Sequence, residues 1–237
     1  MTGAGLRVRD LDSFYGPAQI LFEVGFDVAP GEVVALLGRN GAGKSTTLRS
    51  LMGLMARREG EISFRDTRIE TLPTYEIARL GLGYVPEDRR IFTELTVEEN
   101  LTVGQQRPRE GVTTWTPERL YALFPNLAEM RRRPGGQMSG GEQQMLTIAR
   151  TLMGNPSLIL LDEPSEGLAP KIIEQMADAI VTMKREGLSI VISEQNLHFA
   201  RLICDRAYIL EKGRIRFQGS MAELEADEAV RNQYLAV

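Results

Sequence analysis

The sequence predicts an α/β fold in which helices flank a parallel sheet. Two observations carry this prediction. Residues 33–37 and 158–161 form short, continuously apolar runs, which are typical of strands that are covered on both faces in a parallel sheet. Segments with helical spacing of their apolar residues lie between such runs, and this alternation along the chain indicates a parallel α/β sheet.

The first predicted elements lie on either side of a turn near residue 30. Every second residue from Phe22 to Val28 is apolar, and a Pro-Gly pair then ends the pattern, so we expect a half-buried antiparallel strand there. The buried strand 33–37 follows this turn. A glycine-rich loop, a helical segment at 46–52 and a short apolar strand at 82–85 come next.

The middle of the chain has a different character. Residues 88 to about 138 are richer in Arg and Glu, and they contain helix starts at Thr96 and at Pro117. We therefore predict a mostly helical lobe, extending over residues 88–156, that is inserted into a core formed by residues 1–87 and 157–237.

The alternation of helix and strand returns toward the C-terminus. The predicted elements are a helix at 139–153, a strand at 158–161, a helix at 170–186, a strand at 188–192, a hairpin around 211–213 and a helical stretch capped at Ser220. This order again favours a parallel sheet.

The composition excludes several classes of protein. The 237 residues include 28 Lys or Arg and 32 Asp or Glu, so a net charge of −4 argues against binding nucleic acid mainly through positive charge. One cysteine and one histidine cannot build a disulfide framework or a Cys/His metal cluster within one chain, so oxygen ligands must hold any metal. No run approaches the ~18 apolar residues of a membrane span, and the start lacks the apolar core of a signal peptide, so we expect a cytoplasmic protein.

The glycine-rich loop after the strand 33–37 satisfies the pattern G-x-x-x-x-G-K-[ST]. Its glycines let backbone N–H groups turn inward around phosphate oxygens, and the N-terminus of the following helix adds positive potential. Lys44 would reach the outer phosphates, and Ser45 would offer a ligand to Mg²⁺. The residues predicted to bind a nucleotide are Gly38, Arg39, Asn40, Gly41, Ala42, Gly43, Lys44, Ser45 and Thr46.

Two carboxylates, Asp162 and Glu163, follow the apolar strand 158–161. They are predicted at the carboxyl end of a parallel strand, which is where open α/β sheets bind their ligands. Asp162 is expected to face Mg²⁺ through Ser45 or through water. Glu163, one residue further, is placed to polarise an attacking water molecule.

The segment from Ser139 to Gln143 begins the predicted helix 139–153. Ser139 and Glu142 have the spacing of a capping box. Gly140 and Gly141 each cost about 1 kcal/mol relative to alanine in a helix, and backbone N–H groups left accessible to an anion would explain that cost. A second phosphate-sized site in one chain suggests that each nucleotide is held between two subunits.

With these three motifs, the chain resembles the ATP-binding subunits of ABC transporters over essentially its whole length. The resemblance implies a P-loop NTPase core of the RecA type, with an N-terminal antiparallel β subdomain and an inserted helical subdomain. It also implies that Ser139 to Glu142 of one subunit close over the γ-phosphate of ATP on the partner's loop. Two subunits would then sandwich two ATP molecules, and Tyr15 lies where the family places an aromatic ring that stacks on adenine.

Three positions depart from the usual family pattern. Glu87 stands in place of a glutamine that senses Mg²⁺, and a carboxylate can still reach the metal. Gln195 stands in place of a histidine that senses the γ-phosphate, and its amide can hydrogen-bond that phosphate without carrying a proton charge. The loop 165–170 lacks the aspartate that often follows its leucine. We interpret His198 as the surface of a short helix and not as a displaced sensor.

With these departures and with segment 87–101, the chain resembles the ATPases of branched-chain amino-acid importers. Among these ATPases it resembles the shorter of the two that each importer contains. This resemblance implies two membrane-spanning permease subunits as partners, with a second homologous ATPase or a second copy of this chain. A periplasmic solute-binding protein would take part indirectly. The location implied is the cytoplasmic face of the bacterial inner membrane.

Other functions remain open at this point. Importers of urea or short amides use very similar ATPases, and ATPases of exporters or lipid transporters would carry the same motifs. Repair and translation ATPases that share the signature need long heptad segments or two ATPase halves, whereas this chain has one copy of each motif. We therefore expect no nucleic-acid partner.

Overall fold

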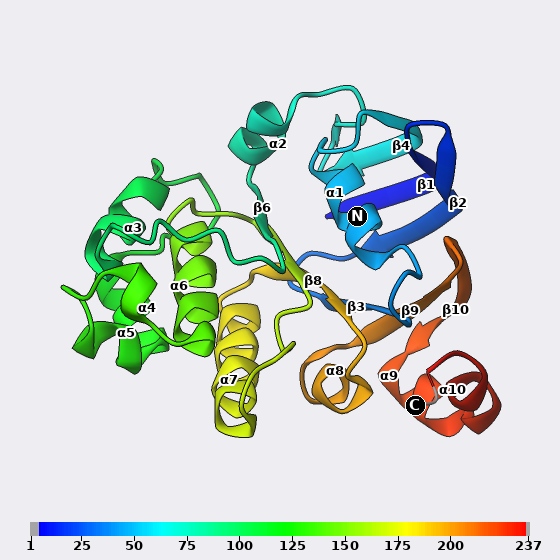
Figure 1. Cartoon of the computed structure of the whole chain (residues 1–237). Helices are drawn as coiled ribbons and strands as arrows, with labels where there is room; N and C mark the ends of the chain where they lie inside the picture. The colour runs from blue at the N-terminus through cyan, green and yellow to red at the C-terminus, as the bar shows by residue number, and fades with distance from the viewer. Residues whose placement is uncertain (1–4, 236–237) are drawn as a thin grey trace.

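Two sheets form the framework of the computed structural model, which describes residues 5–235 (Figure 1). The four-stranded sheet is antiparallel, in the order β2-β1-β4-β5, and the six-stranded sheet has the order β10-β9-β3-β8-β7-β6. The strands are β1 (Leu6–Tyr15), β2 (Ala18–Val28), β3 (Val33–Leu37), β4 (Arg57–Phe64), β5 (Thr67–Arg68), β6 (Leu82–Val85), β7 (Leu158–Asp162), β8 (Ser189–Glu194), β9 (Arg206–Glu211) and β10 (Arg214–Ser220).

The six-stranded sheet is parallel except at one edge. Strands β9, β3, β8, β7 and β6 pair in parallel, and only β10 pairs in the antiparallel sense, with β9. This arrangement confirms the α/β fold class with an additional N-terminal antiparallel sheet. It also confirms the predicted hairpin, which places Lys212 and Gly213 in the turn between β9 and β10.

The pairing register brings three strand ends together at one edge of the sheet. Asp162 at the end of β7 lies opposite Ser193 of β8, and Glu194 of β8 lies opposite Leu37 of β3. Because the glycine-rich loop follows β3, its residues and the side chains at the ends of β7 and β8 meet at this edge.

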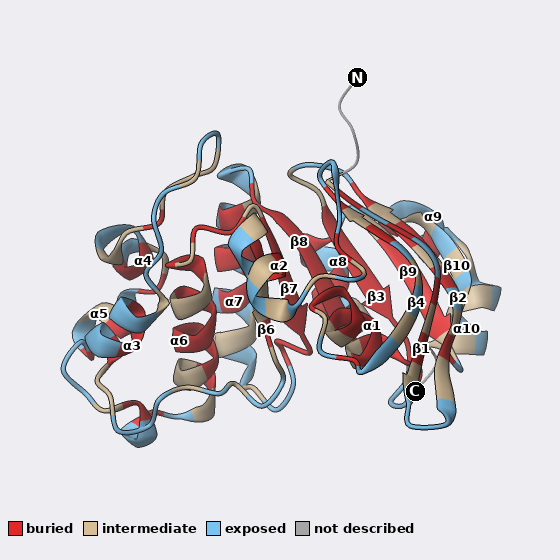
Figure 2. Cartoon of the chain, turned by 90° about the horizontal axis from the view of Figure 1, so that it is seen from above, coloured by how far each residue is buried: buried red, intermediate tan, exposed pale blue. Residues whose placement is uncertain are grey.

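The inner strands of the six-stranded sheet are largely buried (Figure 2). Alternate residues of β3 and β7 face two separate cores, which explains why the sequences 33–37 and 158–161 are continuously apolar. Val34 and Leu36 pack with the antiparallel sheet and with Leu48 of helix α1 (Lys44–Leu51). Val33, Ala35 and Leu37 pack into the other core with the helices of the opposite face. Those helices are α6 (Gly140–Leu152), α7 (Pro170–Arg185) and α8 (Leu197–Ile203).

The inserted segment is helical and lies to one side of the sheets (Figure 1). It contains α3 (Val97–Gly104), α4 (Pro117–Leu123), α5 (Pro125–Glu129), a short 3₁₀ turn at Gly135–Gln137 and α6. Both predicted helix starts are confirmed, because Thr96 forms a capping box before α3 and Pro117 occupies the first turn of α4.

The remaining helices lie outside this lobe. Helix α2 (Thr74–Leu80) precedes β6, and α9 (Met221–Ala226) and α10 (Glu228–Tyr234) follow β10. The predicted cap at Ser220 is confirmed, since its side chain and that of Glu223 form a capping box at the start of α9. None of the helices within residues 5–235 is long and apolar enough to cross a membrane.

Candidate functional site

The glycine-rich loop is held in a backbone conformation that needs glycine at several points. Gly43 has a φ of 110° immediately before α1, and Gly41 has a φ of 77°. At Gly38 a Cβ atom would lie 2.4 Å from the carbonyl oxygen of Leu210, so β9 also excludes a side chain there. The loop can therefore direct backbone N–H groups toward an anion in front of the N-terminus of α1.

The side chain of Lys44 is buried and lies over this loop. Its Nζ donates to the carbonyl oxygens of Gly38 at 2.9 Å and Arg39 at 3.2 Å, and it lies 3.0 Å from Oε1 of Glu163. Phosphate oxygens bound in the loop would compete for the same ammonium group. The predicted loop residue and the predicted catalytic carboxylate are thus in direct contact.

Asp162 is 1% exposed, and three hydroxyl groups donate to it. Ser45 Oγ and Ser193 Oγ donate to Oδ1 at 2.9 and 2.6 Å, and the Tyr84 hydroxyl donates to Oδ2 at 3.1 Å. Burial raises the pKa of Tyr84 above its usual range, and the charge of Asp162 adds to the effect, so this hydroxyl stays a donor. The Ser45 hydroxyl and the Asp162 carboxylate form an oxygen pair that fits Mg²⁺.

Glu163 is the second carboxylate and has a strained backbone, with a φ of 45°. Its backbone N–H donates to the hydroxyl of Ser193 at 3.0 Å, and its Oε2 accepts from Nε2 of Gln195 at 2.8 Å. Burial alone would raise the pKa of Glu163, but the hydrogen bond from Gln195 and the charge of Lys44 outweigh it and lower the pKa. The carboxyl is therefore ionised at neutral pH, as a proton acceptor requires.

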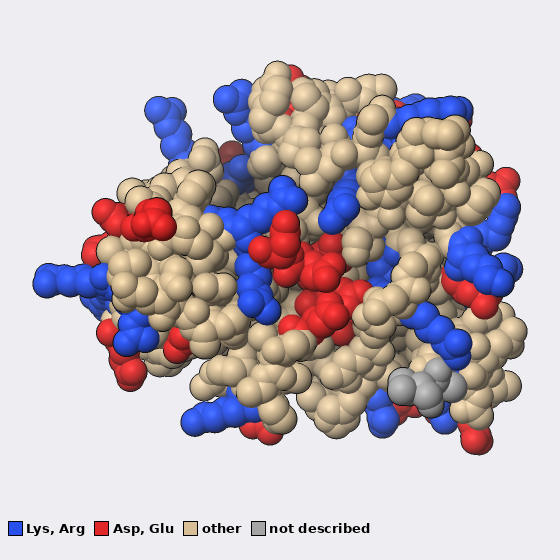
Figure 3. Space-filling view, in the orientation of Figure 1, with Lys and Arg blue, Asp and Glu red and all other residues tan. Residues whose placement is uncertain are grey.

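A cavity of about 470 Å³ is lined by Lys44, Ser45 and Glu163. Figure 3 shows acidic side chains gathered at the middle of this face of the molecule, with basic side chains beside them. The predicted residues among those that line the cavity are Asn40, Gly41, Gly43, Lys44, Ser45, Thr46, Glu87 and Glu163. The structure thus gathers in one cavity the phosphate loop, the position that replaces the usual glutamine and the second carboxylate.

The sequence prediction did not include Glu166, Ser193 and Tyr84 among the functional residues. Glu166 lines the same cavity, and burial raises the pKa of its carboxyl, with further increases from Glu163 and Glu87. Ser193 and Tyr84 both donate to Asp162. Tyr84 lies in the predicted strand 82–85 and Ser193 directly follows the predicted strand 188–192, and these positions are the signals that could have found them. Glu166 follows the chosen Glu163 by three residues.

Several predicted site residues do not line this cavity, namely Gly38, Arg39, Ala42, Asp162, Gln195, Tyr15 and the segment 139–142. Tyr15 ends β1 with 47% of its surface exposed, and its hydroxyl accepts from Nη1 of Arg49 at 3.3 Å. His198 lies exposed on the short helix α8, as the sequence predicted. Tyr15 is thus accessible to a ring stacking on it, whereas His198 is exposed and does not line the cavity.

The segment 139–142 lies at the start of α6 in the helical lobe. Ser139 accepts from the backbone N–H of Glu142 at 3.4 Å, and Glu142 accepts in return from the N–H of Ser139 at 2.7 Å, so the predicted capping box is confirmed. None of these residues is among the described residues that line the phosphate-loop cavity. We therefore expect a nucleotide in the chain's own loop to contact other groups than this segment.

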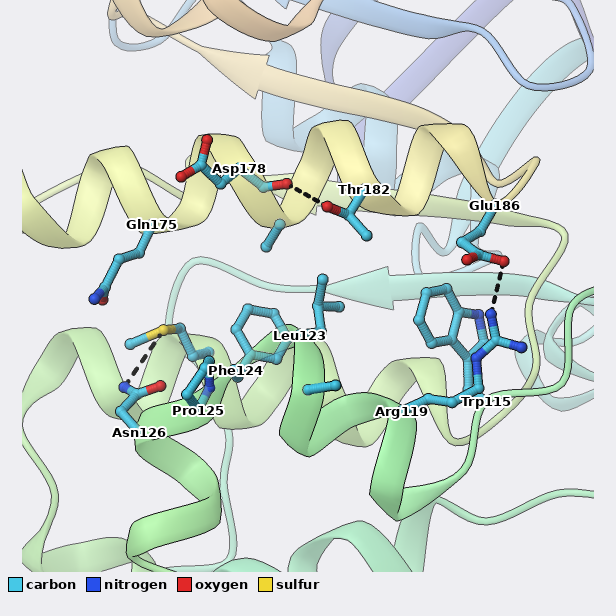
Figure 4. Close-up of a pocket in the computed structure, with 13 residues that line it drawn as sticks. Trp115, Arg119, Leu123, Phe124, Pro125, Asn126, Gln175, Asp178, Thr182 and Glu186 are labelled. Atoms are coloured by element: carbon cyan, nitrogen blue, oxygen red, sulfur yellow. Dashed lines mark hydrogen bonds and ion pairs between the residues drawn. The ribbon is translucent and has the colours of Figure 1, made fainter.

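A second cavity, of about 520 Å³, lies between α4, α5 and α7 (Figure 4). Leu123 and Phe124 give it an apolar side, while Arg119 and Glu186 form an ion pair of 2.7 Å beside Trp115. It contains none of the predicted site residues. We assign this cavity to the packing of the helical lobe against α7.

The contact between Gln195 and Glu163 leads to a testable prediction. Gln195→Ala removes one donor from the carboxylate but leaves Lys44 in place, so we expect ATP turnover to fall by less than about tenfold. His198→Ala, three residues away and exposed, is the matched control and should leave turnover unchanged. Steady-state phosphate release measures both, and a loss with Gln195→Ala as deep as that with Glu163→Gln would contradict the assignment.

Comparison with known families places this geometry among the ABC transporters. The family model described as "ABC transporter" matches residues 21–166. A nucleotide-free ATP-binding cassette from an ABC transporter superposes with a TM-score of 0.82 at 26% identity, over 96% of this chain and 97% of the other.

Curated relatives match almost the whole chain. The branched-chain amino-acid transport ATP-binding protein BraG of Pseudomonas aeruginosa is 44% identical over 97% of this chain and 99% of its own length. The probable branched-chain amino-acid transport protein LivF of Archaeoglobus fulgidus is 37% identical, over 92% and 93% of the two chains. The lipopolysaccharide export protein LptB of Escherichia coli is 34% identical, over 98% and 97%.

Proposed function

The chain belongs to the ABC transporter family, and on this premise we propose that it is the ATP-hydrolysing subunit of an importer for branched-chain amino acids. Subunits of this family couple ATP hydrolysis to transport and work as dimers with membrane-spanning permease components. One observation supports the proposal most strongly. The phosphate loop shares one cavity with Glu87 and Glu163, while the segment 139–142 lies outside it on the helical lobe.

The arrangement supports a division of roles within the chain. The loop from Gly38 to Thr46 would hold the phosphates, with Lys44 on the β- and γ-phosphates and Tyr15 stacked on the base. Ser45, Asp162 and Glu87 would hold Mg²⁺, and the ion, when bound, would neutralise part of the phosphate charge.

The reaction itself would depend on Glu163. Its carboxylate would orient and deprotonate a water molecule for attack on the γ-phosphate. Gln195 holds Glu163 in the described structure and would contact the γ-phosphate from the same place. Lys44 would leave its ion pair with Glu163 for the phosphate, which frees the carboxylate to act.

A partner subunit would complete the site. Ser139, Gly140, Gly141 and Glu142 at the start of α6 would close over the γ-phosphate of ATP held by the partner's loop. The partner would be a second homologous ATPase or a second copy of this chain. The helical lobe, residues 88–156, would move with this closure against two permease subunits at the cytoplasmic face of the inner membrane.

The choice of solute rests on the relatives. The two relatives named for branched-chain amino-acid transport are 44% and 37% identical to this chain. A urea or short-amide importer is the second candidate, because such importers use very similar ATPases. The LptB relative is named for lipopolysaccharide export and is 34% identical, which ranks export lower.

Solute uptake tests this proposal. Cells that lack the chain should lose uptake of radiolabelled leucine and keep uptake of radiolabelled urea, and only the unchanged chain should restore leucine uptake. The Glu163→Gln variant is the control, because it keeps the fold but lacks the carboxylate. Loss of urea uptake instead would assign the chain to the importers of urea or short amides. If the cells keep uptake of both leucine and urea, both assignments are contradicted.

A further inference from the structure

Arg89 lies against the first glycine of α6. A Cβ atom on Gly140 would lie 2.6 Å from Nη1 of Arg89 and 3.2 Å from its Cζ, so the guanidinium occupies the space of a side chain at position 140. The backbone holds it there, because the carbonyl oxygen of Arg89 accepts from Thr147 Oγ1 at 2.9 Å, two turns further along the same helix. Arg89 also has a φ of 62°, a conformation that is unusual outside glycine.

This placement is electrostatically unfavourable without an anion. The start of α6 carries the positive end of the helix dipole, and a cation beside it is repelled. Within residues 5–235 the guanidinium of Arg89 makes no hydrogen bond and no ion pair, although Glu87 and Asp88 lie close in sequence. Asp88 pairs with Arg90, and Glu142 accepts from the backbone of Ser139. Two positive features therefore meet at the start of α6, where no carboxylate of the described residues pairs with the guanidinium.

A buried amide points to the same place. Gln144 follows Gly140 by four residues on α6, so the two share one face of the helix. Gln144 is 3% exposed, and its Nε2 has no hydrogen-bond partner within the described part of the chain. It lines a cavity of about 190 Å³ together with Arg89. A buried donor without an acceptor is costly, so this wall of the cavity is built to receive one.

The opposite wall of this cavity belongs to the chain's own phosphate site. Glu87, Glu163 and Glu166 line it, and they also line the cavity of the phosphate loop. Their negative charge would keep an anion on the side of Arg89 and the start of α6. Figure 3 shows basic side chains bordering the acidic centre on the side of the helical lobe.

We propose that Arg89 is a further phosphate-contacting residue, which donates from its guanidinium to the γ-phosphate of ATP bound to the partner's loop. The assignment rests on the proposed function, because only the sandwich of two subunits brings that phosphate to the start of α6. The planar guanidinium can donate two parallel hydrogen bonds to phosphate oxygens. Since ADP lacks the γ-phosphate, Arg89 would favour the closed pair only with ATP.

The strength of the ATP-bound dimer tests the role of Arg89. In a Glu163→Gln background, we compare Arg89→Gln with Arg132→Gln, which removes the same charge from an exposed residue of the helical lobe. Sedimentation equilibrium in saturating ATP gives the dimer dissociation constant. Arg89→Gln should raise this constant about tenfold or more, Arg132→Gln should change it by less than about twofold, and Arg89→Lys should lie between them.

A second measurement separates the partner's site from the chain's own. Equilibrium dialysis with radiolabelled ATP, at protein concentrations too low for dimers, should give the same affinity for Arg89→Gln and Arg132→Gln. If the Arg89→Gln monomer loses affinity for ATP by the same factor as the dimer loses stability, Arg89 contacts the nucleotide of its own chain, and the proposal is overturned. An unchanged dimer dissociation constant for Arg89→Gln would also overturn it. If the Glu163→Gln parent itself stays monomeric in ATP, the two-subunit sandwich fails and the assignment of Arg89 fails with it.

Discussion

Glu163→Gln should lower ATP hydrolysis by about 10²- to 10⁴-fold, which is the usual contribution of a positioned general base. The amide has the size of the carboxyl, so the hydrogen bond with Gln195 and the packing at the end of β7 persist. The ion pair with Lys44 is lost, which leaves that ammonium free for phosphate. We therefore expect ATP binding to be retained and the closed dimer to accumulate.

Phosphate release and ATP binding measured on the same preparation check this prediction. Glu129→Gln is the matched control, because Glu129 is exposed at the end of α5 and far in sequence from every site residue. The control should hydrolyse ATP at the unchanged rate. Hydrolysis by Glu163→Gln at the rate of the control would remove Glu163 from its assigned role.

Ser139→Asp should abolish the ATP-dependent dimer while each subunit still binds ATP. Aspartate caps helices as well as serine does, so α6 should keep its start and the fold its stability. The added carboxylate would meet the partner's γ-phosphate and repel it. Because segment 139–142 lies outside the chain's own phosphate-loop cavity, binding of ATP by the monomer should not change.

A second capping box in the chain supplies the control for this variant. Ser220 and Glu223 form the same reciprocal pair at the start of α9. Ser220→Asp therefore makes the same chemical change at a helix start that has no proposed ligand, and it should leave dimer formation unchanged. Sedimentation velocity in ATP distinguishes the two variants, and a dimer of Ser139→Asp as stable as that of Ser220→Asp would refute the role of this segment.

The elements that the sequence predicted well are those with one clear period. The run 33–37 is buried on both faces and is strand β3, and the alternation from Phe22 to Val28 lies within β2. Strand β1 escaped prediction because its pairing shifts register at several points between Val8 and Phe14, which breaks the alternation of side chains. Strand β4 begins Arg-Arg-Glu-Gly-Glu, and its mostly polar first half reads as a loop.

The site was predictable where one motif contains the chemistry, as in the loop that ends at Lys44. The contacts of Glu163 were not, because they join residues about 30 positions or more apart through the register of the sheet. Gln195 reaches Glu163 only because β8 pairs with β7, and Tyr84 reaches Asp162 only because β6 lies on the other side of β7. A local pattern does not contain this information.

Mixing two variants tests the composite site most directly. In a Glu163→Gln background, Lys44→Ala removes the cation of the phosphate loop without leaving a buried carboxylate unpaired, and Ser139→Asp blocks the partner's side of the site. Each variant alone should stay monomeric in ATP. A mixed pair contains one intact site, built from the Lys44 of one chain and the Ser139 of the other.

The second site of that mixed pair carries both changes. It holds no ATP, so the aspartate there meets no phosphate and does not oppose closure. We therefore predict that the equal mixture forms a dimer in ATP and retains one ATP for each pair, as counted with radiolabelled nucleotide. A mixture that stays monomeric, or a dimer formed by Ser139→Asp alone, would show that the phosphate site is not completed by the partner subunit.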